Sequence, residues 1–106
     1  MSNADPAKVF AALGDRTRLQ LVQRLSDGGA YSIQDLSAGS AISRQAVTKH
    51  LRVLEQARLV RSTRYGREVR FRLEQDAIAD MQAFLAAVGR QWQEALDRLT
   101  RHIEER

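Results

Sequence analysis

The stretch that decides the fold of this 106-residue chain is SIQDLSAGSAISRQAVTKHLRVL, residues 32–54. Ser32, with Asp35 three residues later, has the pattern of a capping box, which predicts the start of a short helix. Ser43 is a suitable N-cap for a second helix, and only the turn residues 39–42 separate the two. Two helices joined by so short a turn predict a helix-turn-helix unit.

The second helix of this unit is amphipathic. Val47, Leu51 and Leu54 recur at positions i, i+4 and i+7, so they form one apolar face. The opposite face carries the polar and basic side chains Arg44, Gln45, Thr48, Lys49 and Arg52. Because the apolar face packs against the core, we expect the polar face to lie open to solvent, where it can contact a ligand.

Two short helices are predicted before this unit. The first begins at an Asp-Pro pair, residues 5–6, and ends at Gly14. The second begins after Asp15 and ends at the Gly-Gly pair of residues 28–29. A brief extended connection follows at Tyr31. The expected apolar positions are Val9, Phe10 and Leu13 in the first helix and Leu19, Val22 and Leu25 in the second.

After the helix-turn-helix unit the periodicity changes from helix to strand. Apolar residues alternate with arginines over residues 69–73, which predicts a strand with one buried face. An extended run over residues 59–65 precedes Gly66, a residue that permits a tight turn. The segment is therefore predicted to be a β-hairpin with a basic tip.

Helical periodicity returns in one long terminal helix over residues 77–105. Its apolar positions are spaced by three and four residues, close to a coiled-coil seam: Ile78, Met81, Leu85, Val88, Trp92, Ala95, Leu99 and Ile103. An exposed seam of this length would form a large apolar patch, so we expect it to be covered. Its first turns can cover the core of the same chain, while the later turns pack against a second copy.

The sequence is mainly α with a small β-hairpin, and its length predicts one domain spanning residues 1–106. No run of roughly 18 apolar residues occurs and Met1–Pro6 lacks the pattern of a signal peptide, so we expect a cytoplasmic protein without membrane contact. The absence of cysteine excludes disulfides, thiolate metal sites and cysteine nucleophiles. No glycine-rich phosphate loop or nucleophile–base arrangement is found, so we do not expect an enzyme.

Positive charge is concentrated between Arg44 and Arg72. This segment carries nine Lys or Arg against two Glu, whereas the rest of the chain has eight basic and eleven acidic residues. Such a segment on a folded domain is typical of a protein that binds a polyanion. Two interpretations remain open: a sequence-specific DNA-binding regulator, or a module whose basic hairpin binds RNA or an acidic protein.

Three stretches follow one another in the order found in a known family: FAALGDRTRL at residues 10–19, ISRQAVTKHLRVL at residues 42–54, and ARLVR with YGR at residues 57–61 and 65–67. Together they resemble the ArsR/SmtB family of winged helix-turn-helix repressors, although Arg16 stands where a proline is more usual. The resemblance implies a winged helix-turn-helix fold and a transcriptional repressor that binds double-stranded DNA.

An α-helix fits the major groove of B-DNA, so the first exposed turns of the second helix of the unit are expected to reach the bases. Arginine and lysine suit guanine acceptors or phosphates, and glutamine suits adenine. His50 has two interpretations, a phosphate contact or a partly buried packing residue. The hairpin arginines either reach the minor groove or phosphates, or guard a solvated edge. The predicted DNA-binding residues are Ser43, Arg44, Gln45, Thr48, Lys49, His50, Arg52, Arg64, Arg67 and Arg70.

The resemblance also implies a homodimer, in which the last helix pairs with the first helix and with its symmetry mate. A twofold dimer would place two recognition helices about one DNA turn, roughly 34 Å, apart and would call for an inverted-repeat operator. The predicted interface residues are Val9, Phe10, Leu13, Leu85, Val88, Trp92 and Leu99.

Many members of the family it resembles sense metal ions through cysteines or through acidic and histidine ligands on the terminal helices. His102 and Glu105 share one helix face. Residues 89–91, about three turns earlier, offer no carboxylate or imidazole to complete a site. We therefore expect no metal and no cofactor, keep a metal-responsive repressor as the alternative within the family, and leave the effector open.

Overall fold

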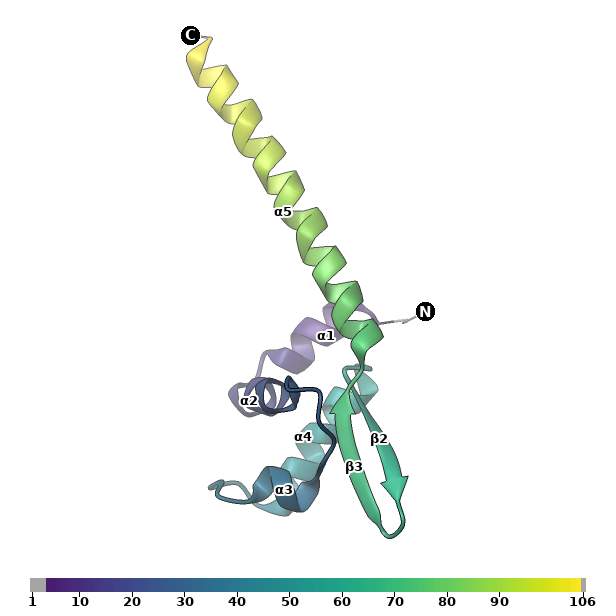
Figure 1. Cartoon of the computed structure of the whole chain (residues 1–106). Coiled ribbons are helices and arrows are strands. Elements are labelled where there is room, and N and C mark those ends of the chain that lie inside the picture. The colour runs from purple at the N-terminus through teal and green to yellow at the C-terminus, as the bar shows by residue number, and fades with distance from the viewer. Residues whose placement is uncertain (1–3, 106) are drawn as a thin grey trace.

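The computed structural model describes residues 4–105. The predicted domain, residues 1–106, also includes residues 1–3 and 106, and these lie outside the described residues, as does part of the Met1–Pro6 segment. The elements follow the predicted order (Figure 1), with one added strand: α1 (Pro6–Leu13), α2 (Arg16–Leu25), β1 (Tyr31–Ser32), α3 (Ile33–Ser37), α4 (Arg44–Gln56), β2 (Val60–Tyr65), β3 (Glu68–Leu73) and α5 (Gln75–Glu104).

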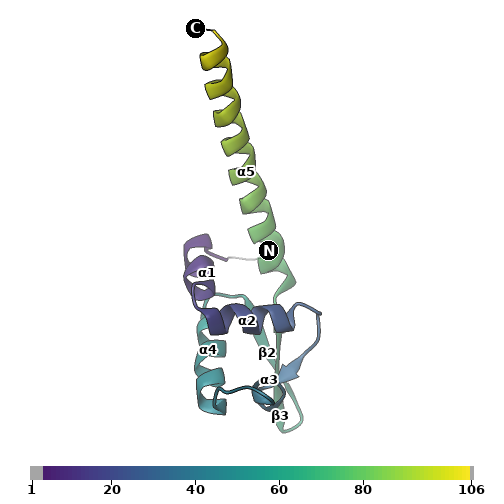
Figure 2. The same cartoon turned by 90° about the vertical axis from the view of Figure 1, so that its left-hand side faces the viewer.

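The molecule consists of a head, formed by α1 to α4 and the sheet, and of the long helix α5, which projects away from it (Figures 1 and 2). The described chain measures 68 Å along its longest axis and only 32 and 21 Å along the others. One hydrophobic core lies in the head and ends at the first turns of α5: Val9, Ala12, Leu21, Leu25, Leu36, Val47, Leu51, Leu54, Ala57, Leu59, Val60, Phe71, Leu73, Ala77 and Met81.

The predicted helix starts are confirmed by hydrogen bonds to the four capping side chains. Asp5 and Asp15 accept from backbone N–H groups in the first turns of α1 and α2. Ser32 and Asp35 form the complete capping box of α3, and Ser43 Oγ accepts from the backbone N–H of Ala46 at 3.1 Å. These bonds satisfy donors that a helix leaves unpaired at its first turn, which explains why the sequence located the starts well.

The inward face of α2 was predicted incorrectly at one position. Leu19 is 42% exposed, whereas Leu21, which was not assigned to the core, is 7% exposed. The pair Leu21 and Leu25 at i, i+4 defines the buried face, and Val22 lies half-buried beside it. Leu19 is separated from Leu21 by about 200° around the helix, so both cannot face the same core.

The sheet has three strands rather than the two of the predicted hairpin. β1, predicted only as an extended connection, pairs with β3 through Tyr31 opposite Phe71, giving the antiparallel order β1-β3-β2. Residues 66 and 67 link β2 to β3, and Gly66 has φ +63°. Arg67, the second turn residue, has no positive φ, so this is the pattern of a type II′ hairpin turn, which glycine at the first position adopts without strain.

A left-handed residue ends α4. Arg58 has φ +63°, its N–H donates to the Glu55 carbonyl, and the N–H of Leu59 donates to the Leu54 carbonyl, both at 3.0 Å. This pair of bonds is a Schellman motif, in which glycine usually occupies the left-handed position. Leu59 is 1% exposed, so its packing fixes the turn that leads into β2.

The two ends of α5 lie in different environments. Ala77 and Met81 are buried and Ile78 is half-buried, so the first turns cover the core of the same chain. From Leu85 onward the large apolar side chains are mostly exposed. Among residues 4–105, no helix combines the length and apolar composition needed to cross a membrane.

Candidate DNA-binding interface

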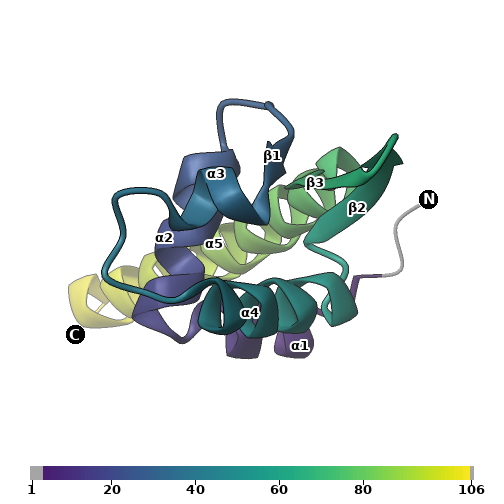
Figure 3. The same cartoon turned by 90° about the horizontal axis from the view of Figure 1, so that it is seen from below.

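The recognition helix α4 lies at the end of the head opposite the free end of α5 (Figure 1). Viewed from below, α4 and the β2–β3 hairpin, which we call the wing, are on the near side of the molecule (Figure 3). Val47, Leu51 and Leu54 are 0 to 1% exposed and anchor α4 in the core. The other face of α4 is therefore held open to solvent in a fixed orientation.

The open face of α4 presents four long side chains without partners. Arg44, Gln45, Lys49 and Arg52 are exposed, and none of their side chains makes a hydrogen bond or ion pair within residues 4–105. Their donors are therefore satisfied by water, which DNA phosphates or base edges can replace. Within residues 4–105 these cations form no ion pair, so the surface attracts polyanions.

Ser43 and Thr48 on the same helix are already partly engaged. Ser43 Oγ caps the helix, and Thr48 Oγ1 donates to the carbonyl of Arg44 at 2.8 Å. A threonine hydroxyl has one donor and two acceptor positions, so Thr48 still offers its methyl group and its oxygen to a ligand. Ser43 and Thr48 are therefore better suited to pack against DNA than to donate hydrogen bonds to it.

His50 faces the α1–α2 corner rather than the open face. Its Nδ1 lies 3.3 Å from Nη1 of Arg18 and 3.9 Å from Oδ2 of Asp15, and the side chain is 24% exposed. Arg18 Nε also donates to the Ala12 carbonyl at 2.6 Å. Because a guanidinium has only donors, Nδ1 of His50 is the acceptor in this contact. Of its two interpretations, the geometry favours the partly buried packing residue.

Asp15 connects this corner to the start of α2. The carboxylate accepts from the backbone N–H of Arg18 at 3.0 Å, and this bond is the main reason that the pKa of Asp15 lies below its usual value. The charge of Arg18 lowers the pKa of Asp15 further. The ionised carboxylate therefore both caps α2 and faces the imidazole of the recognition helix.

The three wing arginines that were predicted to bind DNA are not equivalent. Arg64 and Arg67 are exposed and, within residues 4–105, make no hydrogen bond or ion pair through their side chains. Arg70 Nε lies 2.6 Å from Oε1 of Glu68, and its guanidinium carbon lies 4.7 Å from the centre of the Tyr65 ring. The hydrogen bond to Glu68 raises the pKa of Arg70. Two unpaired cations therefore remain near the tip of the wing.

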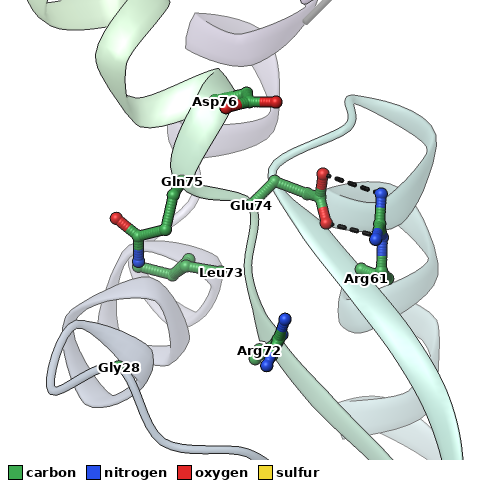
Figure 4. Close-up of a pocket in the computed structure, with 7 residues that line it drawn as sticks. All are labelled: Gly28, Arg61, Arg72, Leu73, Glu74, Gln75 and Asp76. Atoms are coloured by element: carbon green, nitrogen blue, oxygen red, sulfur yellow. Dashed lines mark hydrogen bonds and ion pairs between the residues drawn. The ribbon is translucent and has the colours of Figure 1, made fainter.

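A polar pocket of about 290 Å³ lies at the base of the wing (Figure 4). Arg61 Nε is 2.7 Å from Oε1 of Glu74 on one side of it, and Arg72, Gln75 and Asp76 line the rest with Gly28 and Leu73. The charge of Arg61 is thus paired with Glu74, whereas Arg72 is exposed and has no ion pair within residues 4–105.

Sequence reasoning missed three residues that shape this interface. Arg18 was quoted only as part of a motif, although it connects α1 to the recognition helix. Tyr65 and Glu68 were not assigned a role, although they are directly opposite in the hairpin register. The two-residue turn would have revealed that pairing, because turn length sets hairpin register.

Comparison with known proteins supports the interpretation of this surface as a DNA-binding interface. A family model described as "Helix-turn-helix domain" matches residues 13–63. The HTH-type transcriptional regulator Rv2034 of Mycobacterium tuberculosis is 34% identical over 91 residues, covering 86% of this chain and 81% of that protein. A Synechocystis protein named "Transcriptional repressor SmtB homolog" is 35% identical over 75 residues, covering 71% of this chain and 56% of that protein.

The solved structure of an ArsR-like transcriptional regulator from Rhodococcus sp. RHA1 has a TM-score of 0.78 at 34% identity, covering 88% of this chain and 87% of that one. Fold and interface together define a winged helix-turn-helix transcriptional regulator rather than an enzyme. The chain belongs to the ArsR/SmtB family.

Proposed function

We propose that this regulator represses transcription as a homodimer that binds an inverted-repeat operator in double-stranded DNA. The observation that carries the proposal is the open face of α4, where Arg44, Gln45 and Lys49 stand exposed and unpaired on a helix anchored by three core residues. A rigid helix with donors on its free side fits the major groove, where base edges present distinguishable acceptors.

The side chains divide into two groups by their position. Arg44, Gln45 and Lys49 occupy the first turns of α4 and are assigned to base edges, with Ser43 and Thr48 packing beside them. Arg52 is farther along α4, and Arg64 and Arg67 are on the wing, so these three are assigned to the sugar–phosphate backbone. His50 contributes by holding α4 against the α1–α2 corner.

The exposed apolar face of α5 supports the homodimer. Leu85, Trp92 and Leu99 follow one another at intervals of seven residues and are 54, 66 and 56% exposed. Phe10 of α1 lies beside this face, with its ring centre 5.9 Å from that of Phe84. An apolar surface of this extent on so small a protein is typical of an interface.

The predicted interface loses one residue and gains two. Val9 is 0% exposed because it packs into the core of its own chain, so it offers no surface to a second copy. Leu13 and Val88 are half-buried and keep part of their surface free. Phe84 and Leu96, which are 39 and 49% exposed, extend the same apolar surface and join the proposed interface.

Repression is supported by the SmtB homolog, whose name describes a transcriptional repressor, although this chain covers little more than half of that protein. A repressor of this type must distinguish its operator from bulk DNA by orders of magnitude. A basic module that binds RNA or acidic proteins would instead follow charge alone.

Selection of bound duplexes from a random pool tests the proposal. We expect an inverted repeat whose half-sites are about one helical turn apart. Gln45→Ala should lower the ratio of operator to random-DNA affinity by about 1 to 3 kcal/mol at one base position. Arg67→Ala should weaken both duplexes similarly. Recovery of no preferred sequence, with RNA bound as well as DNA, would reject sequence-specific recognition.

A further inference from the structure

The hairpin register places Tyr65, Glu68 and Arg70 on one face of the wing. Tyr65 is opposite Glu68, and Thr63 is opposite Arg70. Side chains alternate between the two faces of a strand, so Arg64, which is opposite Val69, is on the other face. The wing therefore carries two different surfaces close to its tip.

The contacts of Arg70 occupy its guanidinium within the wing. One edge binds the Glu68 carboxylate at 2.6 Å, and the group as a whole lies 4.7 Å from the centre of the Tyr65 ring. An adjacent carboxylate cancels the charge that a phosphate would meet, and the cation–π contact orients the ring. Arg70 is therefore better placed to hold the Tyr65 ring than to contact a phosphate.

Tyr65 is the last residue of β2 and immediately precedes the turn at Gly66. The side chain is 45% exposed, and within residues 4–105 its hydroxyl has no hydrogen-bond partner. A tyrosine offers an apolar ring that packs on a deoxyribose and a hydroxyl that donates to the acceptors of a minor groove. Tyr65 can therefore contact DNA through an uncharged side chain.

We propose that Tyr65 is the side chain through which the wing contacts the sugars and groove edge of DNA flanking the operator half-site, and that Arg70 and Glu68 are positioning residues that hold its ring. Arg64 and Arg67 supply the phosphate contacts of the wing. The proposal rests on the proposed DNA binding and refines it, because it separates a neutral contact from ionic ones within the same hairpin.

Salt dependence distinguishes the two kinds of contact. Each phosphate that a protein neutralises contributes about 0.9 to the slope of log Kobs against log salt concentration for duplex DNA. Arg67→Ala should therefore reduce the slope by about that amount. Arg70→Ala and Tyr65→Ala should each weaken operator binding roughly tenfold at constant salt while the slope stays unchanged.

The experiment titrates the selected operator with the full chain at several salt concentrations. The proteins compared are the wild type, Tyr65→Ala, Arg70→Ala and the double variant. Arg67→Ala is the matched control. If Arg70 acts by holding Tyr65, the double variant should bind no more weakly than either single variant. Glu68→Gln, which frees the Arg70 charge, should instead steepen the slope by up to about 0.9.

Two results would overturn the assignment: a slope for Arg70→Ala that falls as it does for Arg67→Ala, or Tyr65→Ala binding like wild type. Circular dichroism of each variant confirms that the head is folded. A wild-type protein that shows no preference for any duplex would instead reject the proposed function itself, and so the two failures are distinguishable.

Discussion

The two long amphipathic helices of this protein have similar apolar stripes and opposite patterns of burial. In α4, Val47, Leu51 and Leu54 are at most 1% exposed, and the polar face is open. In α5, Leu85, Trp92 and Leu99 are 54 to 66% exposed, and it is the apolar face that is open. Figure 2 shows why the burial differs: α4 is part of the head, whereas most of α5 extends beyond it.

This difference indicates where each helix acts. A face buried in the core of its own chain contributes to stability, and only the face left open can contact another molecule. The open face of α4 is basic and suits DNA, whereas the open face of α5 is apolar and suits another apolar surface. Amphipathicity alone did not separate the two roles.

The largest effect is expected for Leu85→Glu, which places a carboxylate in the proposed interface. An uncompensated buried charge costs about 3 to 5 kcal/mol, and a twofold dimer would contain two of them. Because Leu85 is exposed in the single chain, the head should stay folded. Sedimentation at micromolar concentration should show monomers that have lost operator affinity.

Ala83→Glu is the matched control for this variant, since Ala83 is exposed and is about 160° from Leu85 around α5. It should remain dimeric. If Leu85→Glu also stayed dimeric, the interface would have to lie elsewhere, and the comparison between α4 and α5 would fail.

A second prediction compares one leucine from each helix in the monomeric Leu85→Glu background. Leu51→Ala removes a side chain that is 0% exposed and should lower the free energy of unfolding by about 2 to 5 kcal/mol. Leu99→Ala removes one that is 56% exposed and should change it by less than about 0.5 kcal/mol. Urea denaturation measures both, and equal losses would show that α5 is buried within the monomer.

A smaller effect of opposite sign is expected where α4 ends. Arg58→Gly relieves the left-handed strain at φ +63° and should raise the free energy of unfolding by about 0.5 to 1 kcal/mol. Arg64→Gly in the extended strand β2 is the control and should destabilise the protein, because glycine weakens strands. Thermal melts that show the same sign for both variants would contradict the assignment of strain at Arg58.

The smallest expected effect is that of zinc on the complex with DNA. Within residues 4–105 no three His, Asp or Glu side chains gather into a group that could hold an ion. A ligand shifts a conformational equilibrium only through its differential affinity for the two states, and a pair such as His102 and Glu105 offers little. Operator binding should therefore be unchanged by micromolar zinc.

Titration of zinc into the complex, with His102→Ala as control, measures this effect. Release of DNA by zinc from the wild type but not from His102→Ala would show that the outer end of α5 is a sensor as well as an interface.

The sequence predicted the local structure of the head well. The caps of α1 to α4, the helix-turn-helix spacing and the tight turn at Gly66 depend on side chains a few positions apart, and all are present. The same locality explains why the exposed positions Arg44, Gln45 and Lys49 could be assigned from the periodicity of a single helix.

Features that depend on contacts between elements were predicted less well. β1 forms because residue 31 meets residue 71, and no local pattern records that pairing. Leu19 was placed in the core and Leu21 left out, since a short helix rich in leucine and valine permits more than one inward face. Val9 was assigned to the dimer interface from the family resemblance, whereas contacts between elements bury it in the core of its own chain.

The sequence by itself determined helices α1 to α5 and the hairpin strands β2 and β3, because capping, periodicity and turn formation act over one or two turns of chain. Only the tertiary structure decided which charges remain free. Arg61 meets Glu74 at the base of the hairpin and Arg70 meets Glu68 on the same face of β3, whereas Arg64 and Arg67 meet no carboxylate within residues 4–105. It also turned His50 toward Arg18 and left all but the first turns of α5 outside the core. Burial and charge pairing depend on distances in space, and these follow from how the elements pack together.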